Sequence, residues 1–388
     1  MTARERMNRA MRPRSGQVPD RVPVMCQLSL GHYFLQAAGS AVDIWHDTAA
    51  FGDALLALQR RYGFDGILVN LPGRDPGWRG ALAAMERRGR DTELRWANGA
   101  VTTAPADDNP HVRTPGRDGV PGRTAATVNP ERLFYVEPHG QFGAEMISAD
   151  GIPPWQFDTI RYVRERAPDV SVHGEVFSPF SQWLEWLEHA EALTQLVEDP
   201  AKVTACLARL AEGAAALARG QAAAGVDAVL ISSAFAGAGF ISRRQYRTFV
   251  LPFERAVVDG VKRAYPDLPV YTHTCGAIGD RLDLMEESGT DGIDTLDPPP
   301  LGTVELADAK QRLGGRLFIK GNLDPVGTLL NGNAESCLSA ALERIAAAKP
   351  GGGYILSSAC SVAPHTPPEN VMQLRRAVEE AGWYDSSQ

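Results

Sequence analysis

Residues 269–276 read Pro-Val-Tyr-Thr-His-Thr-Cys-Gly, a short apolar run that ends in His273 and Cys275 just before another helical segment. A helical stretch precedes this run, beginning at Ser242 and continuing to about Ala264, with Pro266 just beyond it. Short β-rich runs that alternate with long helices predict a parallel sheet with right-handed crossovers. The end of a strand in such a barrel sheet is where catalytic side chains are usually found.

The same alternation extends in both directions along the chain. Helix starts such as Asp199-Pro200, where an N-cap precedes proline at the first helical position, separate several strand-like runs. Eight such alternating units close a (β/α)₈ (TIM) barrel. We therefore expect one barrel domain over residues 1–388, with a helical segment over residues 1–20 at its start. The predicted strands are residues 23–30, 66–70, 171–176, 228–232, 269–273, 292–296, 316–320 and 354–357.

One region, residues 91–128, interrupts this alternation. Residues 93–97 and 100–103 flank Asn98-Gly99, which predicts a β-hairpin with a type I′ turn. The Gly-, Pro- and Arg-rich residues 109–124 predict a long loop. We expect the insertion to lie over one end of the barrel as a lid, with an oligomer contact as the alternative if it lies at the opposite end.

The composition argues against several classes of function. The net charge is −8 and no run of Lys and Arg is present, which argues against a nucleic-acid partner. No window approaches the roughly 20 apolar residues of a membrane span, and the basic first residues lack the apolar stretch of a secretory signal. Five scattered cysteines argue against a disulfide framework and favour a cytoplasmic protein with reduced thiols. Cys26, Cys206 and Cys337 are expected to be small buried hydrophobic residues.

Three residues at predicted strand ends form a candidate metal site. His273 and Cys275 are two residues apart on extended backbone, so their side chains point to the same side. Cys360 follows the last predicted strand, and closure of the barrel brings that strand end to the same mouth. One histidine and two thiolates suit zinc better than a hard cation, and three protein ligands leave one position open for substrate.

These residues also belong to a wider pattern, made of the segments His273-Thr-Cys-Gly, Lys320-Gly-Asn-Leu-Asp-Pro325, and Cys360 followed by Pro364 and Thr366-Pro-Pro-Glu-Asn370. With these segments the chain resembles the uroporphyrinogen decarboxylase superfamily, and more closely its zinc-dependent cobalamin methyltransferase branch, which includes methylcobamide:coenzyme M methyltransferases and corrinoid-dependent O-demethylases. The resemblance covers residues 150–380 well and the first 150 loosely. It implies a (β/α)₈ barrel with His273, Cys275 and Cys360 as zinc ligands.

A fourth ligand is implied by a similar set in cobalamin-independent methionine synthase, where a carboxylate follows on the next strand. Asp297 occupies the comparable position here, and Asp294 is the alternative. We assign Asp297 to the metal site and to catalysis. The competing role of either aspartate is a helix cap or a loop turn.

Other strand-end residues are weaker candidates. Glu175 is expected to be a general base or a partner that orients His273. The expected substrate contacts are His32 and Tyr33 after the first strand, Asn70 after the second and Asn322 after the seventh. His32 and Tyr33 have a competing interpretation as hydrogen-bonded rim residues, and Asp324 has one as a helix cap.

The choice between decarboxylation and methyl transfer depends on charge and metal. Uroporphyrinogen decarboxylases carry an Arg-rich early segment for the many carboxylates of their substrate, whereas residues 21–33 contain only Arg21. Those enzymes also need no metal, so the Cys-His-Cys set would have no role. The alternative that we keep is a metal-free decarboxylase that acts on a small substrate; a non-catalytic zinc-binding barrel is a third possibility.

We therefore expect a zinc-dependent methyltransferase of the EC 2.1.1 type. It would move a methyl group between a corrinoid and a thiol or methoxy substrate, with zinc lowering the pKa of a bound thiol. The direction of transfer stays open. The chain has no DxHxxG cobalamin-binding motif, so the cobalamin or other corrinoid is expected on a partner protein or free in solution.

Overall fold

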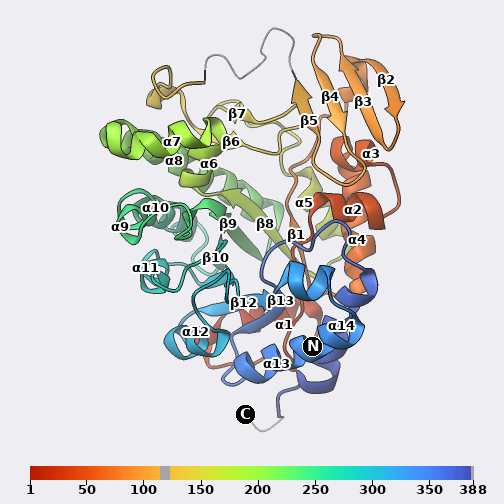
Figure 1. The fold of residues 1–388 in the computed structure, drawn as a ribbon, viewed down its shortest axis with the longest axis vertical. Coiled ribbons are helices and arrows are strands. Elements are labelled where there is room, and N and C mark those ends of the chain that lie inside the picture. Colours follow the sequence, from red (N-terminus) through yellow and green to blue (C-terminus); the bar gives the residue numbers. More distant parts are fainter. Residues whose placement is uncertain (114–122, 386–388) are drawn as a thin grey trace.

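The computed structural model describes residues 1–113 and 123–385, and a curled sheet of seven parallel strands lies at its centre (Figure 1). All seven correspond to predicted strands, and the largest shift is at β12, which begins later and ends later than expected. The strands follow one another around the sheet in the order β1 (Gly66–Val69), β8 (Ser171–Phe177), β9 (Ala228–Ser232), β10 (Val270–Thr274), β11 (Gly292–Thr295), β12 (Phe318–Leu323) and β13 (Tyr354–Ser358).

The eighth place in the ring is taken by the segment predicted as the first strand. Val24 forms a parallel bridge with Leu356 of β13, and Leu28 forms one with Val362. On the other side, the Asp65 N–H donates to the Val24 carbonyl at 2.7 Å, next to β1. The segment thus joins the first and last strands and closes the barrel. It is not a strand over all of residues 23–30, because Ser29 caps a helix that begins at residue 30.

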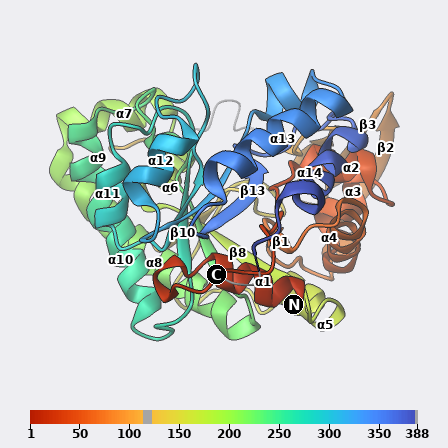
Figure 2. The same ribbon diagram turned by 90° about the horizontal axis from the view of Figure 1, so that it is seen from below.

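Helices cover the outer face of the barrel in both views (Figures 1 and 2). Helix α8 is capped by Asp199, as the sequence predicts, and ends at Gly225 in the left-handed conformation. The helices are α1 (Ala3–Ala10), α2 (Leu30–Gln36), α3 (Ala41–His46), α4 (Thr48–Tyr62), α5 (Asp158–Arg166), α6 (Pro179–Trp186), α7 (His189–Glu198), α8 (Pro200–Ala224), α9 (Arg243–Phe249), α10 (Leu251–Lys262), α11 (Leu282–Glu287), α12 (Leu306–Leu313), α13 (Ala334–Ala348) and α14 (Pro368–Ala381).

One predicted helix is two. The stretch expected to run from Ser242 to about Ala264 is interrupted at Val250, between α9 and α10. Pro252 stands at the start of the second helix, where it lacks an N–H and restricts the residue before it, so the continuous helical ladder is broken.

The N-terminal helix closes the bottom of the barrel. Helix α1 lies against β1 and β8 (Figure 2). Its Met7, Ala10 and Met11 pack in one buried cluster with residues of the barrel interior, including Tyr271 and Phe318. The functional end is therefore the opposite one, at the C-terminal ends of the strands.

The insertion is larger than predicted. It contains a four-stranded antiparallel sheet of β2 (Leu82–Arg88), β3 (Asp91–Trp96), β4 (Val101–Ala104) and β5 (His111–Arg113), followed by the pair β6 (Tyr135–Glu137) and β7 (Glu145–Ile147). The predicted hairpin is confirmed as β3 and β4. Part of the loop expected over residues 109–124 is β5, and residues 114–122 lie outside the described part of the chain.

The hairpin's predicted turn type is wrong. A type I′ turn needs positive φ at both central residues, but of the two only Gly99 has it, at 84°. The Trp96 N–H donates to the Ala100 carbonyl, and the Gly99 N–H donates to the Trp96 carbonyl, each at 2.9 Å. This is a three-residue loop in which a glycine in the left-handed region forms a bulge.

The insertion lies on the mouth side of the barrel. It leaves the sheet after β1 and returns at α5, so it emerges from the C-terminal ends of the strands. Asp107 in the insertion contacts His365, in the loop after β13, with 2.9 Å between Oδ2 and Nε2. This is the placement that a lid requires, and the lid function stays a prediction. Among the described residues, no helix combines the length and the apolar character needed to cross a membrane.

Candidate metal centre and adjoining pocket

Three predicted ligands converge at the mouth of the barrel. His273 and Cys275 come from the end of β10, and Cys360 follows β13. The Cys275 sulfur lies 3.3 Å from His273 Nε2 and 3.7 Å from the Cys360 sulfur, and the Cys360 sulfur lies 3.9 Å from Nε2. Zn–S and Zn–N bonds of about 2.3 and 2.0 Å in a tetrahedron place sulfur atoms about 3.8 Å apart and sulfur and nitrogen about 3.6 Å apart. The three side chains fit such an ion without rearrangement.

The histidine is held with Nε2 directed at the two sulfur atoms. Its Nδ1 lies 3.2 Å from Asp294 Oδ2 and 2.9 Å from Thr295 Oγ1, and Asp294 in turn accepts a hydrogen bond from the Lys320 ammonium at 2.9 Å. All these side chains are buried. An Nδ1–H donated to a carboxylate leaves Nε2 as the electron-pair donor, the usual arrangement of a metal-binding histidine. Asp294, the alternative fourth ligand, therefore acts by orienting His273.

The backbone after β11 is unusual. Thr295 and Leu296 have φ values of 85° and 50°, in the left-handed region that disfavours β-branched residues. Such conformations cost about 1–3 kcal/mol each and persist only where the surroundings impose them. Here the turn brings the Thr295 hydroxyl to His273. The sequence analysis missed Thr295, because no local pattern indicates this backbone conformation.

Asp297 lies beside the three donors but is not one of the converging atoms. Its Oδ2 accepts the Gly276 N–H at 2.5 Å, in the turn that follows Cys275. Burial raises the pKa of Asp297, this hydrogen bond lowers it, and the negative charge of Cys360 raises it. Among the described residues, the metal-binding group consists of His273, Cys275 and Cys360. The role of Asp297 as fourth ligand or catalytic group stays a prediction.

The two thiols shift each other's acidity. A hydrogen bond from Cys275 lowers the pKa of Cys360, burial opposes this, and His273 lowers it further. The same hydrogen bond, together with burial, raises the pKa of Cys275. A metal ion needs both sulfur atoms as thiolates, so its binding would displace the remaining thiol proton.

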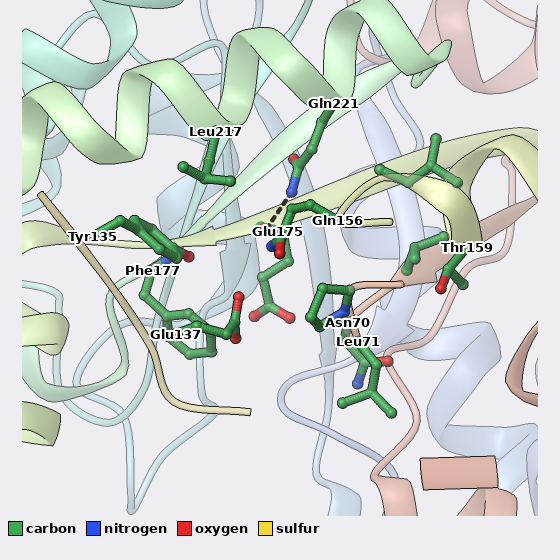
Figure 3. A pocket seen from close by; sticks show the side chains of 13 residues that line it. Asn70, Leu71, Tyr135, Glu137, Gln156, Thr159, Glu175, Phe177, Leu217 and Gln221 are labelled. Carbon is green, nitrogen blue, oxygen red and sulfur yellow. Dashed lines mark hydrogen bonds between the residues drawn. The ribbon is translucent and has the colours of Figure 1, made fainter. Parts of the chain in front are cut away.

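A small cavity of about 20 Å³ lies near this centre (Figure 3). Glu175 at the end of β8 reaches it, and burial raises the pKa of Glu175 to about 7 although His273 lowers it. Glu137 of β6 lines the same cavity, where burial raises its pKa to about 7 against the pull of Arg74. Asn70, a predicted substrate contact, lines it as well. The remaining lining residues include Leu71, Tyr135, Gln156, Thr159, Phe177, Leu217 and Gln221.

The structure separates the two roles expected for Glu175. Asp294 and Thr295 occupy His273 Nδ1, so Glu175 is not the residue that orients this histidine. The role of a base stays a prediction, consistent with its place in the cavity. The sequence analysis missed Glu137, which lies where the resemblance is loose, and Gln156, which lies just inside the well-covered part; no motif marks either residue.

His32 and Tyr33 are inside the protein, contrary to the expected substrate contact. His32 Nε2 lies 2.7 Å from the Tyr62 hydroxyl, and Nδ1 lies 3.2 Å from the carbonyls of Ala363 and Pro364. Tyr33 packs edge-on against Phe51. The reason is the early end of the first barrel segment, which places both residues in α2. The structure favours the hydrogen-bonded alternative for His32.

Asn322 and Asp324, at the end of β12, support neighbouring loops. Asn322 in β12 is buried and donates from Nδ2 to the Leu296 carbonyl at 2.8 Å, next to the left-handed turn. Asp324 accepts the N–H groups of Val326 and Gly327, which is the capping role given as its alternative. Asn322 therefore contacts the backbone that positions the metal centre, and its contact with substrate stays a prediction.

Comparison with known proteins identifies the family. The uroporphyrinogen decarboxylase (URO-D) family model matches residues 145–381. A uroporphyrinogen decarboxylase from Legionella pneumophila (strain Lens) is 30% identical over 234 residues, which are 58% of this chain and 63% of that protein. One from Trichodesmium erythraeum is 36% identical over 165 residues, 42% of this chain and 44% of that protein. The aligned part is thus less than two thirds of the length of these relatives.

Solved structures extend the likeness over the whole barrel. A methyltransferase from Methanosarcina mazei superposes with a TM-score of 0.69 at 20% identity, covering 98% of this chain and 99% of that one. A B12-independent methionine synthase from Shewanella sp. W3-18-1 has a TM-score of 0.52 at 12% identity, covering 93% and 97%. These likenesses show the fold. Because the family model matches more than half of the chain, the protein belongs to the uroporphyrinogen decarboxylase family.

Proposed function

We propose that this protein is a zinc-dependent methyltransferase that moves a methyl group between a corrinoid and a thiol or methoxy substrate. The observation that carries the proposal is the convergence of His273, Cys275 and Cys360 at the barrel mouth, with separations that match the edges of a zinc tetrahedron. A decarboxylase that needs no metal would leave this donor set, and the Asp294 and Lys320 side chains behind it, without a role.

The surrounding residues prepare this site for a substrate thiol or ether oxygen. When bound, zinc would lower the pKa of a coordinated thiol or polarise an ether oxygen. Asp294 holds the histidine ring, and Lys320 holds Asp294. Glu175, whose pKa burial raises to about 7, is suited to accept a proton from an incoming thiol.

The placement of the charged side chains argues against a porphyrin substrate, because Arg21 lies at the end of the barrel opposite the mouth. Arg21, the one arginine of residues 21–33, is 2% exposed, and its guanidinium donates to both carboxylate oxygens of Asp65 at 2.9 Å. It is therefore not available for substrate carboxylates. Two glutamates, Glu137 and Glu175, line the cavity instead and would repel them. The sequence relatives are named as decarboxylases, which favours the alternative function. That alternative is a metal-free decarboxylase that acts on a small substrate.

The corrinoid would be supplied from outside the chain. The sequence contains no DxHxxG motif, so we propose that the carrier is a partner corrinoid protein or free methylcobalamin. The insertion with β2 to β5 lies on the mouth side, where such a partner would approach.

Metal analysis and a methyl-transfer assay test the proposal together. We expect about one zinc per chain, a visible thiolate-to-metal band after exchange with cobalt, and methylation of thiols by methylcobalamin. Cys360→Ala should abolish both metal binding and transfer, and Cys206→Ala, a buried cysteine away from the site, is the matched control. Protein that binds no metal and releases CO₂ from a carboxylic substrate at an undiminished rate in Cys360→Ala would refute the proposal.

A further inference from the structure

Two carboxylates and three side-chain amides are among the residues that line the cavity near the metal centre, beside apolar side chains. Figure 3 shows the carboxylates of Glu137 and Glu175 directed into the same space, with the Gln156 amide and Asn70 at its edge. Glu137 comes from β6 in the insertion and Glu175 from the barrel strand β8. The cavity therefore joins the insertion to the barrel.

These acceptors have few partners within the protein. Glu137 is 5% exposed, and its side chain accepts one hydrogen bond, from the His139 N–H at 3.2 Å. Among the described residues, the buried Asn70 Oδ1 and Gln221 Oε1, both at this cavity, have no hydrogen-bond partner. Buried acceptors without donors are costly, so the arrangement is that of a binding site for a donor.

The nearby cation does not fill this role. Arg74 is buried and donates to the His139 carbonyl at 2.8 Å, and it is not one of the residues that line the cavity. The charge of Arg74 lowers the pKa of Glu137 against the larger effect of burial, but no hydrogen bond or ion pair joins Arg74 to Glu137 or Glu175 in the described part of the chain. Two carboxylates that share a cavity repel each other unless a cation lies between them.

The cavity also adjoins the reacting centre. Glu175 is on β8 next to Ser232 of β9, whose hydroxyl lowers the pKa of Glu175. Ser232 pairs in register with His273 of β10. A substrate with one end in the cavity can therefore present its other end to Cys275, Cys360 and His273.

We propose that this cavity binds the ammonium group of the substrate, so that the methyl acceptor is an aminothiol. The proposal rests on the function proposed above. An ammonium has three N–H donors, and the acceptors Glu137, Glu175 and Asn70 Oδ1 supply three partners and a compensating charge. In the transfer, an S–CH₃ bond forms as the Co–C bond of the corrinoid breaks; the bonding pair stays on cobalt, and the thiol proton leaves to solvent.

Three thiols that share a two-carbon spacer test the charge preference. With methylcobalamin as donor, 2-aminoethanethiol should have a kcat/KM about tenfold or more above that of 2-mercaptoethanol, and 2-mercaptoethanesulfonate should be the poorest acceptor. Glu137→Gln should lower kcat/KM for 2-aminoethanethiol about tenfold and so remove most of the preference for the amine. Glu145→Gln is the matched control, because Glu145 pairs with Glu137 across β6 and β7 but does not line the cavity.

A binding measurement separates this inference from the proposed function. Propylamine should bind the protein in calorimetry, more weakly to Glu137→Gln and to Asn70→Leu, a second variant that keeps both carboxylates. Equal turnover of all three thiols, with no binding of propylamine, would overturn the ammonium site and leave methyl transfer standing. Binding of propylamine that depends on Glu137, with no thiol methylated, would support the site and overturn the function.

Discussion

Replacing Asp294 by asparagine should weaken both the fold and the metal centre. Asp294 is buried between the Lys320 ammonium, at 2.9 Å, and His273 Nδ1, at 3.2 Å. Although burial raises it, these partners hold the pKa of Asp294 at about 2, below its ordinary 3.8, which corresponds to about 2.5 kcal/mol at neutral pH. Asparagine also leaves Lys320 buried without a counter-ion, and such a loss typically costs about 3–5 kcal/mol. We therefore expect the free energy of unfolding of Asp294→Asn to decrease by about 3–5 kcal/mol.

A double substitution separates the two effects. Urea unfolding would report stability, and competition with a chelator would report zinc affinity. Lys320→Met added to Asp294→Asn removes the unpaired charge, so most of the stability should return. The zinc affinity should stay about 10- to 100-fold lower, because His273 has still lost its carboxylate partner. Wild-type stability and affinity in Asp294→Asn would refute this account of the site, and so would recovery of both properties in the double variant.

Three further predictions concern other parts of the molecule. Cys360→Ala should lose zinc with little loss of fold, measured by metal content and circular dichroism, whereas Cys206→Ala should keep its zinc; identical behaviour would make Cys360 structural. Glu254 is buried and accepts a hydrogen bond from Tyr246. Burial raises the pKa of Glu254 to about 7, so its negative charge destabilises the folded state increasingly as the pH rises from about 4.5 to 7. Glu254→Gln should therefore gain up to about 3 kcal/mol in urea unfolding at pH 8 and almost nothing at pH 4; a gain that does not depend on pH would contradict this. Asp107→Ala removes the contact between the insertion and the loop after β13. Methyl transfer from a protein-bound corrinoid should therefore fall more than transfer from free methylcobalamin, with zinc content unchanged. An equal effect on both donors would count against a lid.

The barrel strands and the convergence of His273, Cys275 and Cys360 could be predicted because local and global patterns agree there. Each strand is a short apolar run bounded by caps or prolines, and parallel topology alone brings the ends of β10 and β13 to one mouth. His273, Cys275 and Cys360 could thus be grouped without knowing any loop. The convergence of these three side chains follows from the order of the strands in the sheet.

The parts that could not be predicted depend on contacts between distant segments. Strand β2 reads Leu-Ala-Ala-Met-Glu-Arg-Arg, a run of good helix formers that is a strand because it pairs with β3. The left-handed turn at Thr295, which completes the support of His273, is imposed by the surrounding fold. Glu137 meets Glu175 only because the insertion folds back over the barrel, and no spacing in the sequence relates the two residues.

The charged side chains and the metal donors together indicate which kind of reaction the site can support. Decarboxylation of a polycarboxylate needs cations around the substrate, yet Arg21 is held by Asp65 and the cavity exposes carboxylates. A thiolate or ether substrate instead needs a soft Lewis acid, and the mouth offers one imidazole and two sulfur atoms for it. The same carboxylates that disfavour an anionic substrate favour a cationic one. On the proposed function, Glu137 and Glu175 would select a cationic substrate, and the Cys-His-Cys set would hold the metal ion that activates its thiol.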